Sequence, residues 1–292
     1  TNDGVTTTGG VITIPDVGSS NICVNCHSGR GNMDSLLGAD AADPAFSMAG
    51  VGSGFAPGSR NATATHYLNP GGALWKDLTN TGYEYAGANY ADKPYFAHST
   101  IDATGSGPCA ACHMDSGSSH SYSVVEKDAT GVITAVNSGT CAECHTGGHG
   151  PAFVSPAMVG TAFDFAGGTA VVTQEDADAA AAFLQAEAEG YHGALEALNQ
   201  ALIARDVTFS SNYPYFATTD WINQGVFGAA HNYNYLHHEP GAYAHNRYYA
   251  KRLIFDSIDW LDNFVLDGEI TLTDSHAQHW LNADVDGVAT RP

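Results

Sequence analysis

The sequence predicts a loop-rich first half and a mainly helical second half, organised around covalently attached groups rather than around one large apolar core. Three observations lead to this prediction. All six cysteines fall in three copies of Cys-x-x-Cys-His. The 292 residues include 33 glycines and 11 prolines, which favour turns and loops. Helical apolar spacing is found mainly after residue 160.

The three cysteine motifs match the attachment signature of c-type haem. Two thiols bond to one porphyrin, and the histidine after the second cysteine becomes the proximal iron ligand. The cysteines and proximal histidines are Cys23, Cys26 and His27; Cys109, Cys112 and His113; and Cys141, Cys144 and His145. The sequence therefore predicts three covalently bound haem c groups, and the fold class of a multihaem cytochrome c.

Zinc ribbons, disulfides and thiol redox motifs also use Cys-x-x-Cys pairs. A zinc ribbon places its two pairs about 15–20 residues apart, whereas residues 113 to 140 separate the second pair from the third. Neither zinc nor disulfides would require a histidine at the same offset three times. The haem interpretation is therefore favoured.

Residues 1–160 form the predicted loop-rich region with the three attachment motifs. Short strands are expected at Gly10–Pro15 and Gly131–Val136, where β-branched residues gather. The second and third motifs are close in sequence. This proximity predicts a close pair of haems, with the first haem brought up by the intervening loop.

Residues 161–292 form the predicted helical region, which would supply distal iron ligands. It would also form a subunit interface or, as an equal alternative, cover one face of the haems. One helix is expected from Thr173 to Arg205, with kinks at Gly190 and Gly193. A second is expected from Asn246 to Phe264. Its polar side is predicted to consist of Arg247, Lys251 and Asp262.

The charge balance limits the class of partner. Ten lysines and arginines stand against 31 acidic residues, for a formal net charge of −21. Nucleic acid and anionic membrane surfaces are poor partners for such a chain, whereas basic redox proteins and metal oxides are easier ones. Solubility outside the cell explains the acidity equally well. No apolar run reaches the ~20 residues that span a bilayer.

Haem c is attached beyond the energy-transducing membrane, so the chain is expected to be exported. The polar start Thr1-Asn2-Asp3-Gly4 indicates a mature chain whose signal peptide has been removed.

The histidine content predicts the second iron ligand. Three of the 14 histidines are proximal, which leaves 11, against four methionines. Met114 directly follows a proximal histidine and is poorly placed to bind the same iron. Histidine is therefore expected on both faces of each iron, which gives a low reduction potential. The candidate distal ligands are His66, His98, His120, His231 and His245, with His237 and His238 nearby. His149, His192, His276 and His279 are expected to be solvated.

Several blocks resemble the multihaem c-type cytochromes of metal-reducing bacteria, including those that form extracellular filaments. They are His66-Tyr67-Leu68-Asn69-Pro70, Gly82-Tyr83-Glu84-Tyr85-Ala86-Gly87, His98-Ser99-Thr100, the second attachment motif with Met114, Glu239 through Arg247, and Asp256 through Leu261.

This resemblance implies an exported bis-histidine electron carrier at the cell surface or outside the cell, with the periplasm as the alternative. It implies that the chain polymerises with other copies of itself and exchanges electrons with partner cytochromes or extracellular metal oxide. It favours His66, His98, His120 and His245 as distal ligands. The filament members have four or more haems, whereas this chain has three motifs. A surplus histidine could bind a haem of a neighbouring subunit.

The leading prediction is electron transfer without substrate chemistry, so the chain is not expected to be an enzyme. Two alternatives stay open. One is a monomeric periplasmic electron shuttle. The other is a multihaem reductase of a small oxidant such as nitrite, which needs an open iron position. The sequence lacks the Cys-x-x-Cys-Lys variant that some such reductases use.

Overall fold

A computed structural model describes residues 5–7, 10–27, 69–91, 98–102, 105–114, 122–136, 141, 174–212, 215–216 and 221–292. The predicted division at residue 160 falls outside them.

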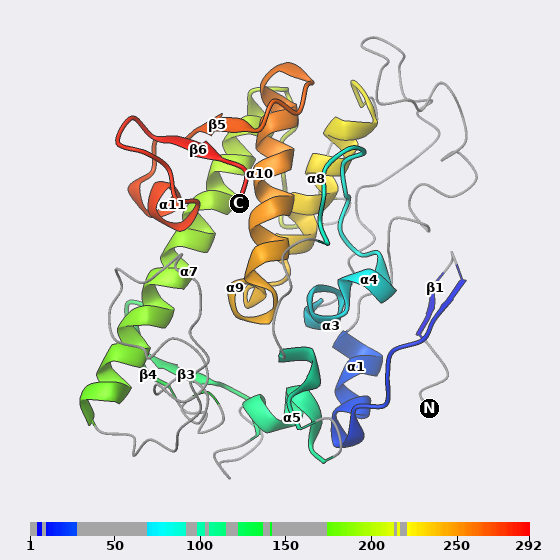
Figure 1. The fold of residues 1–292 in the computed structure, drawn as a ribbon, viewed down its shortest axis with the longest axis vertical. Helices are drawn as coiled ribbons and strands as arrows, with labels where there is room; N and C mark the ends of the chain where they lie inside the picture. The colour runs from blue at the N-terminus through cyan, green and yellow to red at the C-terminus, as the bar shows by residue number, and fades with distance from the viewer. Residues whose placement is uncertain are drawn as a thin grey trace.

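Packed helices form the body of the molecule (Figure 1). They are α7 (Gln174–Ile203), α8 (Gln224–His237), α9 (Ala242–His245), α10 (Arg247–Asn263) and α11 (Ser275–Trp280). Helix α10 packs against both α7 and α8, and α11 packs against α7.

Shorter elements from the first half of the chain lie at the lower end of this body in Figure 1. They are η1 (Gly18–Ser20), α1 (Asn21–His27), α3 (Pro70–Leu74), α4 (Lys76–Thr79), η4 (His98–Thr100) and α5 (Gly107–His113). Helix α3 contacts both α1 and α9, so these small helices are tied to the helical body.

The described strands form separate antiparallel hairpins. They are β1 (Val5–Thr7) with β2 (Gly10–Ile12), β3 (Val125–Lys127) with β4 (Ile133–Val136), and β5 (Glu269–Thr271) with β6 (Val288–Thr290). The strands expected at Gly10–Pro15 and Gly131–Val136 are thus present as β2 and β4, each shorter than predicted. Their partners β1 and β3 were not predicted.

The two long helices were predicted almost to the residue. Helix α10 begins after Asn246, whose side chain accepts the Tyr249 amide, and ends at Phe264 in the left-handed conformation. Helix α7 runs without a break through Gly190 and Gly193, and the kink expected there stays a prediction. A Cβ at Gly190 would lie 2.4 Å from Cβ of Trp280, and one at Gly193 would lie 2.4 Å from the Asp274 carboxylate. These glycines let the segment that contains α11 approach α7.

The main core joins both halves of the chain. Asn232 on α8 accepts the Tyr83 amide at 2.7 Å, and the Tyr85 hydroxyl donates to the Gly225 carbonyl at 2.8 Å. Tyr83 and Tyr85 are both buried in the apolar cluster of the helical body. The segment around Tyr83 and Tyr85 is therefore part of this body rather than a loop that lies on it.

Helix α10 differs from its prediction in one respect. Arg247 and Lys251 were expected on a polar side, but both are buried, whereas Asp262 is exposed. Arg247 pairs with the buried Glu187 of α7 at 3.0 Å. The Lys251 ammonium donates to the Trp280 carbonyl. The polar stripe of α10 thus faces α7 and the C-terminal segment, because these elements supply acceptors for its cations.

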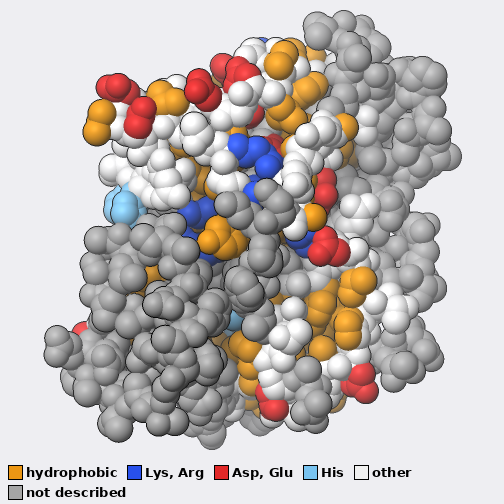
Figure 2. Space-filling model, in the orientation of Figure 1, with side chains coloured by type: hydrophobic (Ala, Val, Ile, Leu, Met, Phe, Trp, Pro, Cys, Tyr) orange, Lys and Arg blue, Asp and Glu red, His pale blue; other side chains and the backbone are white. Residues whose placement is uncertain are grey.

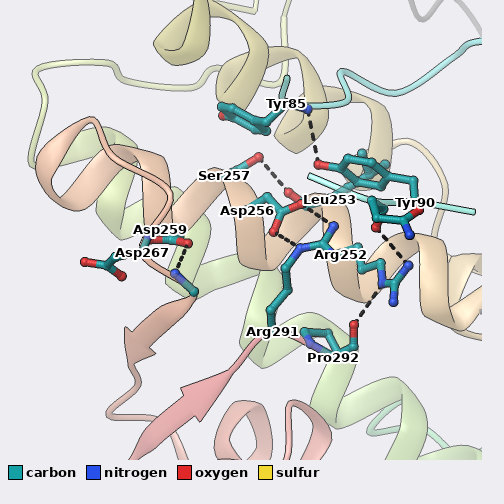
Figure 3. A network of polar contacts seen from close by, with 12 residues as sticks. Tyr85, Tyr90, Arg252, Leu253, Asp256, Ser257, Asp259, Asp267, Arg291 and Pro292 are labelled. Carbon is teal, nitrogen blue, oxygen red and sulfur yellow. Dashed lines mark hydrogen bonds and ion pairs between the residues drawn. The ribbon is translucent and has the colours of Figure 1, made fainter. Parts of the chain in front are cut away.

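A second polar network joins α10 to the C-terminus (Figure 3). The Arg291 guanidinium donates to both oxygens of the buried Asp256 carboxylate, at 2.7 and 2.8 Å. Arg252 donates to the Pro292 and Asn89 carbonyls at 2.8 and 2.9 Å. On the face of the molecule drawn in Figure 2, the basic side chains lie in the middle and the acidic ones lie mostly toward the periphery.

Candidate haem-binding site

The first two attachment motifs lie on the short helices α1 and α5. In a helix, residues at i, i+3 and i+4 share one face. This spacing places Cys109, Cys112 and His113 together on α5, and the first motif has the same spacing on α1. Helical geometry thus brings two thiols and one imidazole to the same side, as attachment to a single porphyrin requires.

The starts of these two helices are in close backbone contact. A Cβ at Gly18 would lie 2.0 Å from the Gly105 carbonyl oxygen, and one at Gly107 would lie 2.0 Å from the Val17 carbonyl oxygen. Both glycines have positive φ, at +59° and +74°. The Ser20 hydroxyl donates to the Ser106 carbonyl at 2.7 Å and accepts the Ala110 amide at 2.9 Å.

This contact brings the first and second motifs side by side. The Cys109 and Cys23 thiols interact. The pKa of Cys109 is raised to about 11, mainly by burial and also by the neighbouring Cys23. The pair of the second and third motifs that proximity in sequence predicts stays a prediction, because the third motif lies outside the described residues except for Cys141. A small apolar cluster of Ile14, Val17, Val24 and Trp75 packs beside the first two.

The third motif is described only at Cys141, which is half-buried and packs against the main core. Cys144 and His145 lie outside the described residues, as do the candidate ligands His66 and His120. Their predicted roles stay predictions.

The rings of His113, on α5, and His245, on α9, lie close together. Their ring centroids are 6.2 Å apart, with 40° between the ring planes. The His113 Nδ1 lies 2.7 Å from the Tyr122 carbonyl, and the His245 Nδ1 lies 2.5 Å from Oε1 of the buried Glu239. Because each Nδ1 has another partner, Nε2 is the ring nitrogen that each would offer to a metal. Burial lowers the pKa of His113, and nearby His245 and His27 act in the same direction.

His98 lies next to this pair. Its Nδ1 is 2.7 Å from the carbonyl of Ala244, the residue before His245. Burial lowers the pKa of His98, which favours the neutral ring that binds iron. The short helix α9 thus positions two of the predicted distal ligands.

His231 has a different environment. It is fully buried on α8, with Nε2 2.7 Å from the Thr81 carbonyl, and burial lowers its pKa to about 4. Its ring stacks on Tyr235 at 6.4 Å between centroids. Because Nε2 contacts Thr81, the predicted ligand role would fall to Nδ1, which is buried and has no hydrogen-bond partner among the described residues.

The donor set fits a haem better than a bare metal ion. No group of three or more histidine, cysteine, aspartate or glutamate side chains converges on a metal-sized point among the described residues. A metal lies about 2 Å from each imidazole nitrogen, and the nitrogen about 1 Å from its ring centre, so two axial imidazoles place their centroids about 6 Å apart. The 6.2 Å between His113 and His245 agrees with this spacing. Cys109 and Cys112 precede His113 on the same helix, as thioether attachment requires.

Sequence reasoning missed two groups at this site. The Glu239 carboxylate and the Tyr122 carbonyl each contact a ring nitrogen. The fold alone brings Tyr122 to His113, so no sequence signal marks it. For Glu239, the turn-forming Pro240-Gly241 that follows indicates a chain reversal, but not which side chain it would orient.

No helix in the described part of the chain has the length and apolar character needed to cross a membrane.

Comparison with known proteins identifies relatives of the chain. It is 35% identical over 303 aligned residues to the C-type polyheme cytochrome OmcB of Geobacter sulfurreducens, which covers 93% of this chain and 35% of OmcB. The C-type polyheme cytochrome OmcC of the same organism is also 35% identical, over 93% of this chain and 34% of OmcC. No family model and no solved structure matches. The chain spans about a third of the length of these relatives, and over that span it is homologous to polyhaem c-type cytochromes.

Proposed function

We propose that this chain is an exported electron carrier with three covalently bound haem c groups, each held between two histidines. The observation that carries the proposal is the close pair of His113 and His245, whose ring centroids are 6.2 Å apart. His113 lies on the same helix as two attachment cysteines, and His245 lies beside the turn at Glu239. Similarity to polyhaem c-type cytochromes supports it. When bound, haem iron supplies reversible one-electron exchange.

The chain's own residues would attach the groups, orient their ligands and keep them close together. Cys109 and Cys112 would form the thioether links of the second haem, with His113 proximal and His245 distal. The Tyr122 carbonyl and the Glu239 carboxylate fix the orientation of these two rings. His98, next to α9, is proposed as a distal ligand of a neighbouring haem.

Two strong ligands on one iron suit electron transfer rather than substrate reduction. His113 and His245 would together leave no position on that iron for a substrate, and both would stay bound when an electron is gained or lost. The contact between α1 and α5 would hold two haems at a fixed separation. These features favour the carrier over the reductase.

The axial pair is tested with His245→Met in the full, haem-loaded chain, with His276→Met as the control. His276 is an exposed histidine on α11. Mass measurement should give three haems for every chain. His245→Met should change the low-spin electron paramagnetic resonance signal of one haem and raise one reduction potential, because methionine ligation raises it. The control should change neither, and an unchanged spectrum in His245→Met would refute the pair.

For assembly, the proposal is an extracellular filament of copies of this chain that passes electrons to cytochromes or metal oxide. The resemblance to filament cytochromes, the surplus of histidines and the acidic charge of −21 support it. Electron microscopy of native material should show a polymer. Uniform monomers at high concentration would favour the soluble shuttle instead.

A further inference from the structure

We propose that Glu239 positions His245 as a ligand of the iron held by the second attachment motif. Its hydrogen bond to His245 lowers the reduction potential of that haem. The inference rests on the proposed axial pair of His113 and His245.

The contact between Glu239 and His245 is built into a rigid turn. The Glu239 amide donates to the Leu236 carbonyl at 3.0 Å, and the Glu239 carbonyl accepts the Tyr191 hydroxyl at 3.0 Å. Gly241 separates the two residues in sequence, and a Cβ there would lie 2.9 Å from Cε1 of His245. The glycine therefore leaves room for the imidazole beside the carboxylate.

Burial makes this carboxylate unusual. Glu239 is 1% exposed, and one of its carboxylate oxygens lies 2.5 Å from Nδ1 of His245. Removing a carboxylate from water costs several kcal/mol unless a positive charge or hydrogen bonds offset it. The pKa of Tyr191 and of Tyr235 is raised, mainly by burial and then by Glu239, so these neighbours are neutral hydroxyls. A positively charged iron centre on the far side of His245 would balance Glu239.

The other ligand rings have weaker acceptors. The Nδ1 atoms of His113 and His98 face the backbone carbonyls of Tyr122 and Ala244. A charged acceptor makes a stronger hydrogen bond than a neutral carbonyl. The bond to Glu239 would increase electron donation from His245 and raise its basicity as a ligand. Both this effect and the negative charge favour ferric over ferrous iron, which lowers the reduction potential.

The test is Glu239→Gln in the full haem-loaded chain, followed by a spectroelectrochemical titration. Glutamine retains the size and the acceptor oxygen but removes the charge. One haem should favour the ferrous state at least tenfold more at a fixed potential, a rise of about 59 mV for a one-electron couple. Glu196→Gln is the matched control, because it removes the same charge from an exposed position on α7. Glu239→Asp keeps the charge, and should raise the potential less than Glu239→Gln.

The outcomes separate this inference from the proposed function. If Glu239→Gln keeps all haems low-spin and moves no potential further than Glu196→Gln, the role of Glu239 is refuted and the axial pair stands. If one haem becomes high-spin, Glu239 is needed to hold His245 in place, which supports the positioning role. If His245→Met leaves the native spectrum unchanged, the axial pair itself fails, whatever Glu239→Gln shows.

Discussion

Replacing Gly107 by alanine should separate the two haem-attachment helices. Gly107 has φ of +74°, and the new Cβ would lie 2.0 Å from the Val17 carbonyl oxygen. The left-handed conformation costs alanine about 1–2 kcal/mol. Because backbone lies in the way, α5 must also move from η1. This movement would break the bonds from Ser20 to Ser106, from Ala110 to Ser20 and from Ser19 to Gly105. At about 1 kcal/mol each, these add about 3 kcal/mol.

Gly131→Ala is the matched control. Gly131 has φ of +90°, and its Cβ would meet nothing within 4 Å. Gly131→Ala should therefore lower the free energy of unfolding only by the cost of the left-handed conformation, about 1–2 kcal/mol. The assay is equilibrium unfolding by guanidinium of chains with equal haem content, together with circular dichroism of the haem absorption band, which reports coupling between neighbouring haems. Gly107→Ala should lose about 3 kcal/mol more than the control and weaken the haem signal. Equal losses in the two variants would refute the interlocked contact.

Three further predictions concern buried charged and titratable groups. Burial lowers the pKa of His231 to about 4, so the unfolded chain binds a proton at this residue more readily than the folded chain does. The free energy of unfolding should therefore fall by up to about 3 kcal/mol as pH drops from 6.5 to 4. In unfolding titrations, His231→Gln should weaken this pH dependence. Burial lowers the pKa of Lys251 to about 7, so the unfolded chain again binds more protons than the folded chain. This residue should therefore raise the free energy of unfolding as pH rises from 7 to 10. Lys251→Met should remove that gain, and a variant with the same pH dependence of stability as the unmutated chain would contradict the burial of the amine. Arg291→Gln leaves the buried Asp256 without its guanidinium and should cost about 3 kcal/mol, whereas adding Asp256→Asn should restore part of the loss in a double-mutant cycle.

The sequence predicts local structure well where one pattern decides it. The apolar residues of α7 and α10 recur at helical spacing, and Asn246 is a helix-capping residue. Helix α8 was not predicted. Its sequence mixes glycine, histidine and asparagine with apolar residues, and it is buried on all sides from Gly225 to Leu236. A helix enclosed on every side has no solvated stripe, so periodicity gives no signal for it.

The parts of the site that sequence could not predict depend on long-range contacts. The three cysteine motifs are recognised directly in the sequence, but nothing in their spacing shows that α1 and α5 meet through Gly18 and Gly107. From sequence, Arg247 and Lys251 of α10 resemble a solvent-facing stripe. Only the fold supplies their partners, Glu187 and the Trp280 carbonyl. Glu239 gains its importance only because the turn at Gly241 places its carboxylate against His245.

Helix α9 shows how the two halves depend on each other. The His245 ring lies close to His113 of α5, and the Ala244 carbonyl contacts His98. The next residue, Asn246, donates to the Ala73 carbonyl of α3 at 3.0 Å and caps α10. A single turn of helix thus links the first-half helices to the main body and positions two predicted iron ligands. The second half has no haem-attachment motif, yet on this geometry the coordination proposed for the first half is completed only when α9 is in place. Its large core is therefore the support that fixes the ligands rather than a separate unit.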